Sequence, residues 1–329
     1  MARIAVVFTG GTISMAFDAD AGGNVPSLDG AAILARTPGL DKLADVVPID
    51  RGLTPASHFS FADVLAIGAR VQTALDDPAI DGAVVVQGTD TIEETSFAWD
   101  LVLASPKPVV VTGAMRAAHE DGYDGPANLR RAVAAAASPA LRGAGVVVTL
   151  AGTLEAADDA VKLHTSALDT FRSPNGGTLG SVGDDGTVTV TRARGSRRSL
   201  RPVPSAGAVV HHVQAGIGTD GALLDAAIAA GAQGIVVAAT GAGNTHPGLL
   251  AAAQRAMADD VVVALASRCV AGGVSTAYAF PGGGGTWVRA GAIRTGTLCA
   301  IKARVALALA LGAGLGRDGI AALLADPLG

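Results

Sequence analysis

The feature that most constrains this chain is a regular alternation of short apolar runs with alanine-rich stretches of helical character. Strands are expected at Ile4–Phe8, Gly82–Val86, Val109–Thr112, Val146–Leu150, Val209–Val213, Ile235–Ala239 and Val261–Ala266, with an added edge strand at Thr187–Thr191. Helices are expected at Phe61–Leu75, Ala127–Ala137, Ala222–Ala230 and Pro247–Ala258. Strands that alternate with helices pair in parallel through right-handed crossovers. The pattern therefore predicts an α/β fold on open, mostly parallel sheets.

The alternation is interrupted once, and the interruption suggests two domains. Residues 192–204 hold five arginines and no acidic residue. A chain of 329 residues is also long enough for roughly two domains of about 150 residues. We expect two three-layer α/β domains, a larger N-terminal one at 1–191 and a smaller C-terminal one at 207–329, joined by a linker at 192–206. The linker is interpreted as a solvated segment, with nucleic-acid contact as the alternative.

Charge and hydropathy narrow the class of protein. The net charge of −5 gives no reason to expect nucleic acid or an anionic membrane as a partner. No secretory signal precedes the first strand, and the longest Ala/Leu run, near Val305 to Leu311, is much shorter than the roughly 20 residues that span a bilayer. We therefore expect a soluble, cytoplasmic protein.

Two predicted strands end in similar polar turns. The first runs into Thr9-Gly10-Gly11-Thr12 and the second into Gly88-Thr89-Asp90-Thr91. Active sites of open α/β sheets form at the carboxyl ends of strands, where free N–H groups of helix starts stabilise negative charge. Each turn taken singly could be an ordinary helix cap. Two such ends in one chain, both rich in hydroxyls, indicate an active site with Thr12 and Thr89 in it.

A threonine nucleophile requires a partner that takes its proton. A desolvated lysine can do so, and Lys162 is one of only four lysines in the chain. We expect Lys162 to be buried against Thr89 with its ammonium form disfavoured. The alternative is a surface residue, or an ion pair with Asp158 or Asp159.

These motifs resemble the bacterial L-asparaginase/glutaminase family, and their order and spacing agree over nearly the whole chain. The resemblance is carried by TGGTI at 9–13, QGTDTIEET at 87–95, VVVTGAMR at 109–116, DGPANL at 124–129, VKLHTSALDTFRSPN at 161–175, GIVVAATGAGN at 234–244 and KARVALALAL at 302–311. It implies hydrolysis of the side-chain amide of L-asparagine through a threonine acyl-enzyme, with no metal and no organic cofactor. It also implies a homo-oligomer, a dimer or tetramer, with active sites at subunit interfaces.

The resemblance assigns roles by position. Thr12 matches the nucleophile, whereas Thr89, Lys162 and Asp90 match a triad that handles protons. Asp90 also matches the group that holds the substrate's α-amino group. The other expected substrate-binding residues are Gly11, Ser57, His58, Gly88, Ala114, Asn244 and Tyr278, with Asn244 supplied by a neighbouring subunit.

Three departures from the family pattern affect the expected site. Gln87 replaces a histidine of the second motif, at a position that supports the loop. The segment Ser14–Pro26, expected to be a mobile lid, lacks the tyrosine found there in well-studied members, and the chain's tyrosines are Tyr123 and Tyr278. No acidic residue lies between Val261 and Arg317, where some members place a glutamate. Tyr278 is either a replacement for these groups or an interface packing residue.

Other functions stay open at this point. Within the family they are a glutaminase-asparaginase of broad specificity, a non-catalytic binder of asparagine or aspartate, and the deamidating subunit of a tRNA-dependent amidotransferase. The last is not expected, because it normally has an extra N-terminal domain. A literal GxGxxG at 216–221 could bind a dinucleotide, but the fingerprint's acidic residue is missing where the next strand ends, at Thr240 and Gly241. We interpret that match as a tight turn.

Overall fold

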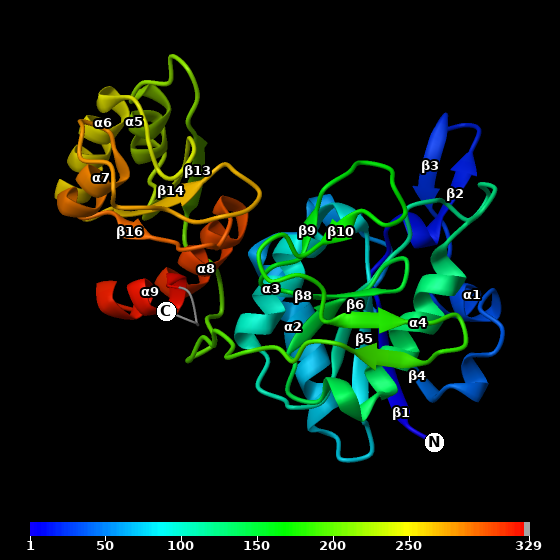
Figure 1. Cartoon of the computed structure of the whole chain (residues 1–329). Coiled ribbons are helices and arrows are strands. Elements are labelled where there is room, and N and C mark those ends of the chain that lie inside the picture. The colour runs from blue at the N-terminus through cyan, green and yellow to red at the C-terminus, as the bar shows by residue number, and fades with distance from the viewer. Residues whose placement is uncertain (326–329) are drawn as a thin grey trace. The chain divides into compact units, whose positions relative to one another are not determined.

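The structure is a computed structural model and describes residues 1–325 (Figure 1). Two compact units divide the chain, and the boundary in sequence falls between Arg197 and Arg198. The two-domain α/β fold predicted from the sequence is confirmed, with mostly parallel sheets in both units.

The first unit is built on an eight-stranded sheet in the order β12-β11-β8-β7-β6-β5-β1-β4. The strands β4, β1, β5, β6 and β7 are parallel, and the strands beyond β7 are antiparallel. Their bounds are β1 Arg3–Phe8, β4 Asp45–Asp50, β5 Gly82–Val86, β6 Val109–Thr112, β7 Val146–Val148, β8 Thr153–Ala156, β11 Gly180–Val182 and β12 Val188–Val190. Two short antiparallel pairs stand apart from this sheet, β2 Met15–Asp18 with β3 Gly23–Pro26, and β9 Val161–Lys162 with β10 Phe171–Arg172.

Helices cover both faces of this sheet, which gives three layers. The helices are α1 Gly30–Ala35, α2 Phe61–Asp76, α3 Ile92–Val102 and α4 Gly125–Ala137, and the short turns are η1 Thr12–Ser14, η2 Leu40–Lys42, η3 Ala56–His58, η4 Thr89–Thr91 and η5 Pro139–Leu141. Ile33 of α1 and Leu129 of α4 pack in one core with alternate residues of β1 such as Val6. On the other face α2 and α3 pack together, and the Trp99 indole donates a 2.8 Å hydrogen bond to the Val64 carbonyl.

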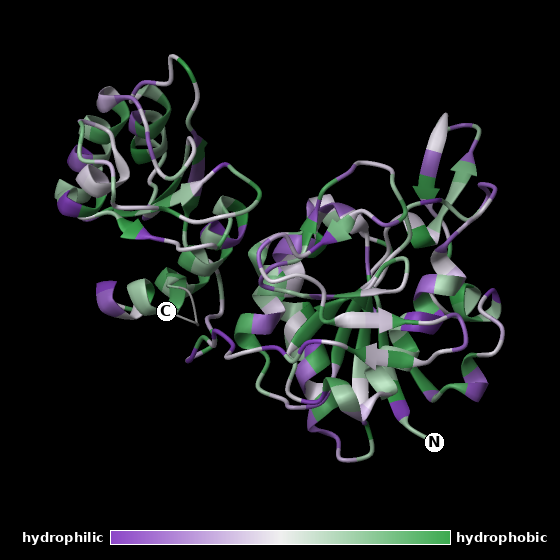
Figure 2. Ribbon diagram, in the orientation of Figure 1, coloured by the Kyte–Doolittle hydropathy of each residue, from purple (hydrophilic) through white to green (hydrophobic). Residues whose placement is uncertain are grey.

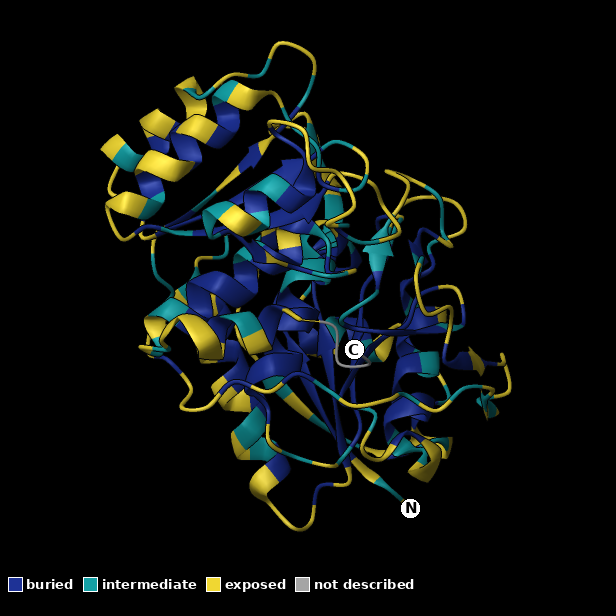
Figure 3. Cartoon of the chain, turned by 60° about the vertical axis from the view of Figure 1, so that its left-hand side comes forward, coloured by how far each residue is buried: buried dark blue, intermediate teal, exposed yellow. Residues whose placement is uncertain are grey.

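The second unit repeats the plan with a parallel four-stranded sheet, β13-β14-β15-β16. Its elements are β13 Val210–Gln214, α5 Ala222–Ala229, β14 Gly234–Ala239, α6 Pro247–Ala258, β15 Val262–Ser267, α7 Gly284–Ala290, β16 Ile293–Arg294, α8 Ala300–Gly312 and α9 Arg317–Leu324. Residues of α5, α6 and α7 share one core with the sheet, while α8 packs on β13, β14 and β15. In both units the central strands are apolar (Figure 2) and buried (Figure 3), as β5 and β14 illustrate.

The strands predicted from apolar runs are all present, and β12 is the expected edge strand. The structure adds β4, which pairs in parallel with β1 although it contains Pro48. Proline is tolerated there because β4 lies at the edge of the sheet, where a missing N–H leaves no ladder bond unmade. The predicted lid at 14–26 is a β-hairpin rather than an irregular loop, and the Asp18 carboxylate accepts two backbone N–H groups of its turn.

The interpretation of the arginine-rich segment as solvated was wrong for two of its arginines. The Arg194 guanidinium is 4% exposed and bonds the Asp100 carboxylate at 2.6 Å and that of Asp158 at 2.9 Å. Arg198 is buried and donates to the Leu323 carbonyl at 3.0 Å. The sequence places no acid near these arginines, but the fold brings carboxylates and helix-end carbonyls to them.

Candidate active site

The turns that follow β1 and β5 touch through their glycines. These strands are parallel neighbours, so both turns leave the sheet at the same edge. Gly11 has φ 95°, a left-handed conformation that favours glycine, and a Cβ placed on it would lie 2.1 Å from the Gly88 nitrogen. Gly11 and Gly88 are the residues before η1 and η4, which begin at Thr12 and Thr89. The two predicted threonines therefore start adjoining turns.

Gln87 supports the second of these turns. Its side chain is fully buried, and its amide oxygen accepts a 3.0 Å hydrogen bond from the Thr95 hydroxyl. Its amide nitrogen donates to the Gly88 carbonyl at 3.2 Å. Gln87 therefore braces the backbone just before Thr89.

Lys162 reaches the second turn from the short β9–β10 hairpin. Its Nζ atom lies 2.9 Å from the Thr89 hydroxyl and 2.7 Å from the Asp90 carboxylate. The Lys162 side chain is 13% exposed and that of Asp90 is 76% exposed. Thr89 is buried, so the cluster has a sheltered hydroxyl and a carboxylate open to solvent.

The alternative ion pairs for Lys162 are not formed. Asp158 pairs with Arg194, and the Asp159 carboxylate accepts backbone and side-chain N–H groups of Asn175. The lysine is therefore directed to the hydroxyl and carboxylate of η4.

A residue absent from the sequence prediction holds Lys162 in register. The Glu93 carboxylate, in the first turn of α3, accepts the Lys162 backbone N–H at 3.2 Å. On the other side of the hairpin, Lys162 pairs with Phe171. Glu93 stands 69 residues from Lys162 in sequence. It lies in the quoted IEET motif, but no spacing rule marks it as an acceptor for so distant an amide.

The predicted residues Ser57 and His58 lie on η3, next to the η4 turn. Both are exposed, whereas Ala56 before them is buried. The Thr91 hydroxyl donates to the Ala56 carbonyl at 3.2 Å, which ties η3 to η4. The side chains of Ser57 and His58 are therefore exposed to solvent beside the turn that begins at Thr89.

Ala114 is buried in the loop that follows β6. The Asp124 carboxylate accepts the Met115 N–H at 3.1 Å and the Arg116 N–H at 3.0 Å. The Asn128 amide donates to the Gly113 carbonyl at 3.1 Å and to Asp124 at 2.9 Å. The DGPANL motif therefore fixes the backbone on both sides of Ala114.

Tyr123 immediately precedes the same motif and was not predicted to belong to the site. Its hydroxyl donates a 2.8 Å hydrogen bond to the carbonyl of Ile13, the residue after Thr12. Burial raises the pKa of the Tyr123 phenol to about 12; Arg36 opposes this with a smaller lowering, and Asp124 adds a smaller raising. The phenol therefore stays protonated, and a donor, at neutral pH.

Asn244 and Tyr278 belong to the second unit, whereas the other predicted site residues belong to the first. The Asn244 side-chain oxygen accepts the Gly284 N–H at 3.4 Å, at the start of α7. Tyr278 is 44% exposed, and its ring lies 5.9 Å from that of Phe280. Both residues border the same helix start within their unit.

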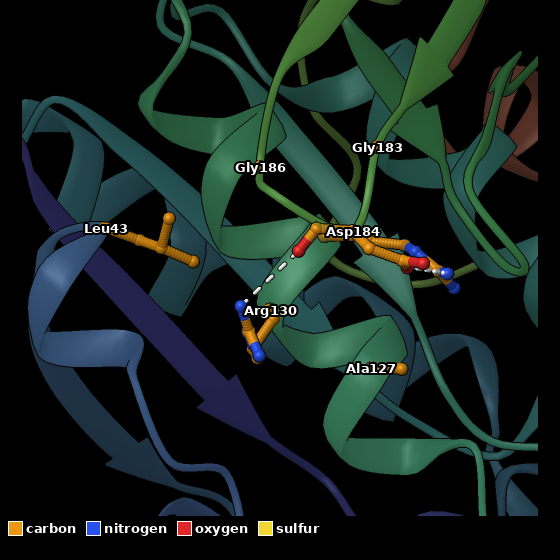
Figure 4. Close-up of a pocket in the computed structure, with 7 residues that line it drawn as sticks. Leu43, Ala127, Arg130, Gly183, Asp184 and Gly186 are labelled. Carbon is orange, nitrogen blue, oxygen red and sulfur yellow. Dashed lines mark hydrogen bonds and ion pairs between the residues drawn. The ribbon is translucent and has the colours of Figure 1, made fainter.

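A cavity elsewhere in the first unit is not part of this constellation (Figure 4). Its volume is about 130 Å³, and it is lined by Leu43, Ala127, Arg130, Arg131, Gly183, Asp184 and Gly186. The Asp184 carboxylate pairs with Arg131, and the Asp184 backbone carbonyl accepts from Arg130 at 3.4 Å.

The literal GxGxxG at 216–221 forms a turn closed by the Gly216 N–H on the Thr219 hydroxyl at 2.8 Å. A Cβ at Gly221 would lie 2.6 Å from the Ala252 side chain, so that glycine serves the packing of α5 on α6.

Two further observations concern membranes and metals. Within residues 1–325, no helix is long and apolar enough to cross a membrane. Over the same residues, no group of three or more His, Cys, Asp or Glu side chains is placed to hold a metal ion.

Comparison with known proteins identifies the family of the chain. Residues 3–194 match the family described as "Asparaginase, N-terminal", and residues 209–324 match the "Glutaminase/Asparaginase C-terminal domain". The chain is 35% identical to a probable L-asparaginase of Deinococcus radiodurans, over 97% of this chain and 95% of that protein. It is 31% identical to an L-asparaginase of Bacillus licheniformis, over 94% and 95%. The crystal structure of a probable cytoplasmic L-asparaginase from Campylobacter jejuni superposes with a TM-score of 0.89 at 29% identity, covering 98% of this chain and 99% of that one. The chain belongs to the asparaginase family.

Proposed function

We propose that this protein hydrolyses the side-chain amide of L-asparagine to L-aspartate and ammonia. The observation that carries the proposal is the cluster in which the Lys162 Nζ atom lies 2.9 Å from the Thr89 hydroxyl and 2.7 Å from the Asp90 carboxylate. The Gly11–Gly88 contact brings this cluster to the turn that begins at Thr12. The relatives named as L-asparaginases over nearly the full length add support.

In the proposed reaction, the Thr12 oxygen forms a bond to the amide carbon as its proton passes to the enzyme. Backbone N–H groups of the two turns stabilise the oxyanion. The C–N bond then breaks, and the amine leaves as ammonia after it receives a proton. Water attacks the resulting ester, which releases aspartate and restores the Thr12 hydroxyl. Thr89, Lys162 and Asp90 move the protons.

Substrate binding is divided among several groups in this proposal. The Asp90 carboxylate, which is exposed, holds the substrate's α-amino group. Ser57 and His58 contact the α-carboxylate from η3. Gly11, Gly88 and Ala114 line the reacting amide with backbone, and Asn244 and Tyr278 complete the site across a subunit interface.

The test is ammonia release by the purified protein with asparagine and with glutamine as separate substrates. Thr12→Ala should lower the rate by a few orders of magnitude while the fold and oligomer persist. Lys162→Met should abolish hydrolysis while asparagine still raises the melting temperature. Comparable rates on both amides would indicate a glutaminase-asparaginase instead. A thermal shift with asparagine and no ammonia from the wild-type protein would indicate a binder.

We further infer a homo-oligomer, a dimer or tetramer, located in the cytoplasm, with domain limits at 1–191 and 207–329. The family matches at 3–194 and 209–324 support these limits, and the Campylobacter jejuni relative is named as cytoplasmic. Light scattering on the eluting protein measures the oligomer. A monomer with full activity would contradict a site shared between subunits.

A further inference from the structure

The segment that follows Thr12 is held from one side by residues 118–123. The Tyr123 hydroxyl donates to the Ile13 carbonyl at 2.8 Å, and the Ala118 N–H donates to the Met15 carbonyl at 3.1 Å. Farther along, the rings of Phe17 and His119 lie 5.9 Å apart. The contacted residues are 13, 15 and 17, alternate positions of a segment that runs from η1 into β2. One loop therefore sets the position of both the threonine turn and the hairpin.

From this arrangement we propose that Tyr123 is a positioning residue for the nucleophile, because its hydroxyl fixes the turn on which Thr12 stands. The inference rests on the proposed role of Thr12. It gives the half-buried Tyr123 a function in the reaction without any contact to substrate.

Besides the bond from Tyr123, main-chain hydrogen bonds hold this three-residue turn. The Ser14 N–H donates to the Gly11 carbonyl at 2.8 Å, the Met15 N–H donates to the Thr12 carbonyl, and the Ser14 carbonyl accepts from Ser27 and Leu28 at 2.8 and 2.9 Å, while no side chain caps the turn. So short a 3₁₀ turn has poor hydrogen-bond geometry. A bond to the Ile13 carbonyl restrains the peptide plane between Ile13 and Ser14, and so limits how far the turn that carries Thr12 can shift. Misplacement of a reacting group by about 1 Å can cost about a hundredfold in rate.

The Tyr123 hydroxyl is itself held in place by its surroundings. A Cβ on Gly125 would lie 2.4 Å from the Tyr123 oxygen, so the ring packs against that glycine. The Tyr123 N–H donates to the Glu120 carbonyl at 3.1 Å. The next residue, Asp124, is anchored on the Met115 and Arg116 N–H groups. The phenol is thus a fixed donor tied to the loop after β6.

The chemistry of the phenol separates positioning from proton transfer. Burial raises its pKa to about 12, so it remains a neutral donor across the range in which the enzyme would be assayed. A neutral phenol that donates its hydrogen to a backbone carbonyl does not act as the base that takes the Thr12 proton. Its removal should therefore scale the rate by the same factor at every pH between 7 and 9.

The test is Tyr123→Phe, which keeps the ring and deletes the hydroxyl. Thr37→Val is the matched control, because the buried Thr37 hydroxyl also donates to a backbone carbonyl, Ile33, at 2.8 Å. Thr37 lines a cavity with Met1 and Asp45, where β1 and β4 begin, whereas Thr12 follows the carboxyl end of β1. Both variants should lower the melting temperature by similar amounts.

We expect Tyr123→Phe to lower kcat for asparagine about tenfold with KM unchanged, and Thr37→Val to leave both unchanged. The inference is overturned if Tyr123→Phe keeps kcat within twofold of wild type, or if Thr37→Val loses as much. A wild-type to variant rate ratio that grows between pH 7 and 9 would also overturn it, in favour of the phenolate as a base.

A second variant covers the case in which Tyr123→Phe does not fold. Gly125→Ala displaces the phenol and should reproduce the loss in kcat, whereas a wild-type kcat would refute the inference. Thr12→Ala separates the two levels of the proposal. An active Thr12→Ala removes the proposed mechanism, whereas an inactive Thr12→Ala with a fully active Tyr123→Phe removes only the positioning role.

Discussion

Replacing Asp100 with alanine should destabilise the first unit far more than the loss of one surface carboxylate. The Asp100 side chain is fully buried at the C-terminal end of α3. It accepts from Arg194 at 3.0 and 2.6 Å, from the Val146 N–H at 2.9 Å, and pairs with the Arg197 guanidinium at 3.3 Å. In Asp100→Ala the buried Val146 N–H loses its acceptor, and the Arg194 and Arg197 guanidinium groups lose a carboxylate that balances their charge. Removing one partner of such a buried pair costs about 3–5 kcal/mol.

Asp45→Ala is the control in the same unit. Asp45 pairs with Arg3 at 3.2 Å, but the side chains are 62% and 47% exposed, so the loss should stay below about 1 kcal/mol. Urea denaturation followed by fluorescence measures both, because the buried Trp99 lies on α3 beside Asp100. The free energy of unfolding should fall by at least twice as much for Asp100→Ala. Equal losses would refute the argument from burial.

Three further outcomes are expected. Glu93→Ala should lower kcat about tenfold, because the Lys162 N–H loses its acceptor, while Glu93→Gln should stay near wild type, since an amide oxygen also accepts. Equal losses in both would refute that reason. If the Tyr278 hydroxyl serves the site, Tyr278→Phe should lose at least tenfold in kcat/KM, about 1.4 kcal/mol, and an unchanged value would assign it to packing. If the hairpin at 15–26 gates the site, its hydrogen exchange should slow when aspartate is added, and identical exchange would contradict gating.

The strands and helices that show a regular pattern of apolar residues could be predicted from the sequence. Apolar runs such as Gly82–Val86 and the alanine-rich helices follow from burial, and both predicted threonine turns lie at strand ends as expected. The approach of Lys162 to Thr89 was predicted from the rarity of lysine and the family resemblance. Its grouping with Asp90 followed from the family resemblance, because the residues alone also allowed an ion pair with Asp158 or Asp159, which are nearby in sequence.

The contacts that the sequence could not reveal are long-range and involve backbone. Glu93 binds an amide 69 residues away, and Tyr123 a carbonyl 110 residues away. A main-chain partner leaves no trace in residue type, so neither contact has a motif. The burial of Arg194 was missed for a related reason, since its carboxylates come from α3 and from the turn after β8.

The backbone contact between the two threonine turns limits how this enzyme could acquire a new specificity. A side chain at Gly11 would overlap the Gly88 nitrogen, and one at Gly113 would lie 2.4 Å from the Gln87 carbonyl oxygen. Neither glycine can be replaced, in natural variants or in a mutant library, because the added Cβ would collide with main-chain atoms. Variation has to enter from the exposed side chains of Ser57 and His58 and from the hairpin, where new groups meet solvent. Selection for another amide should therefore accumulate changes around the rim while the glycines stay fixed.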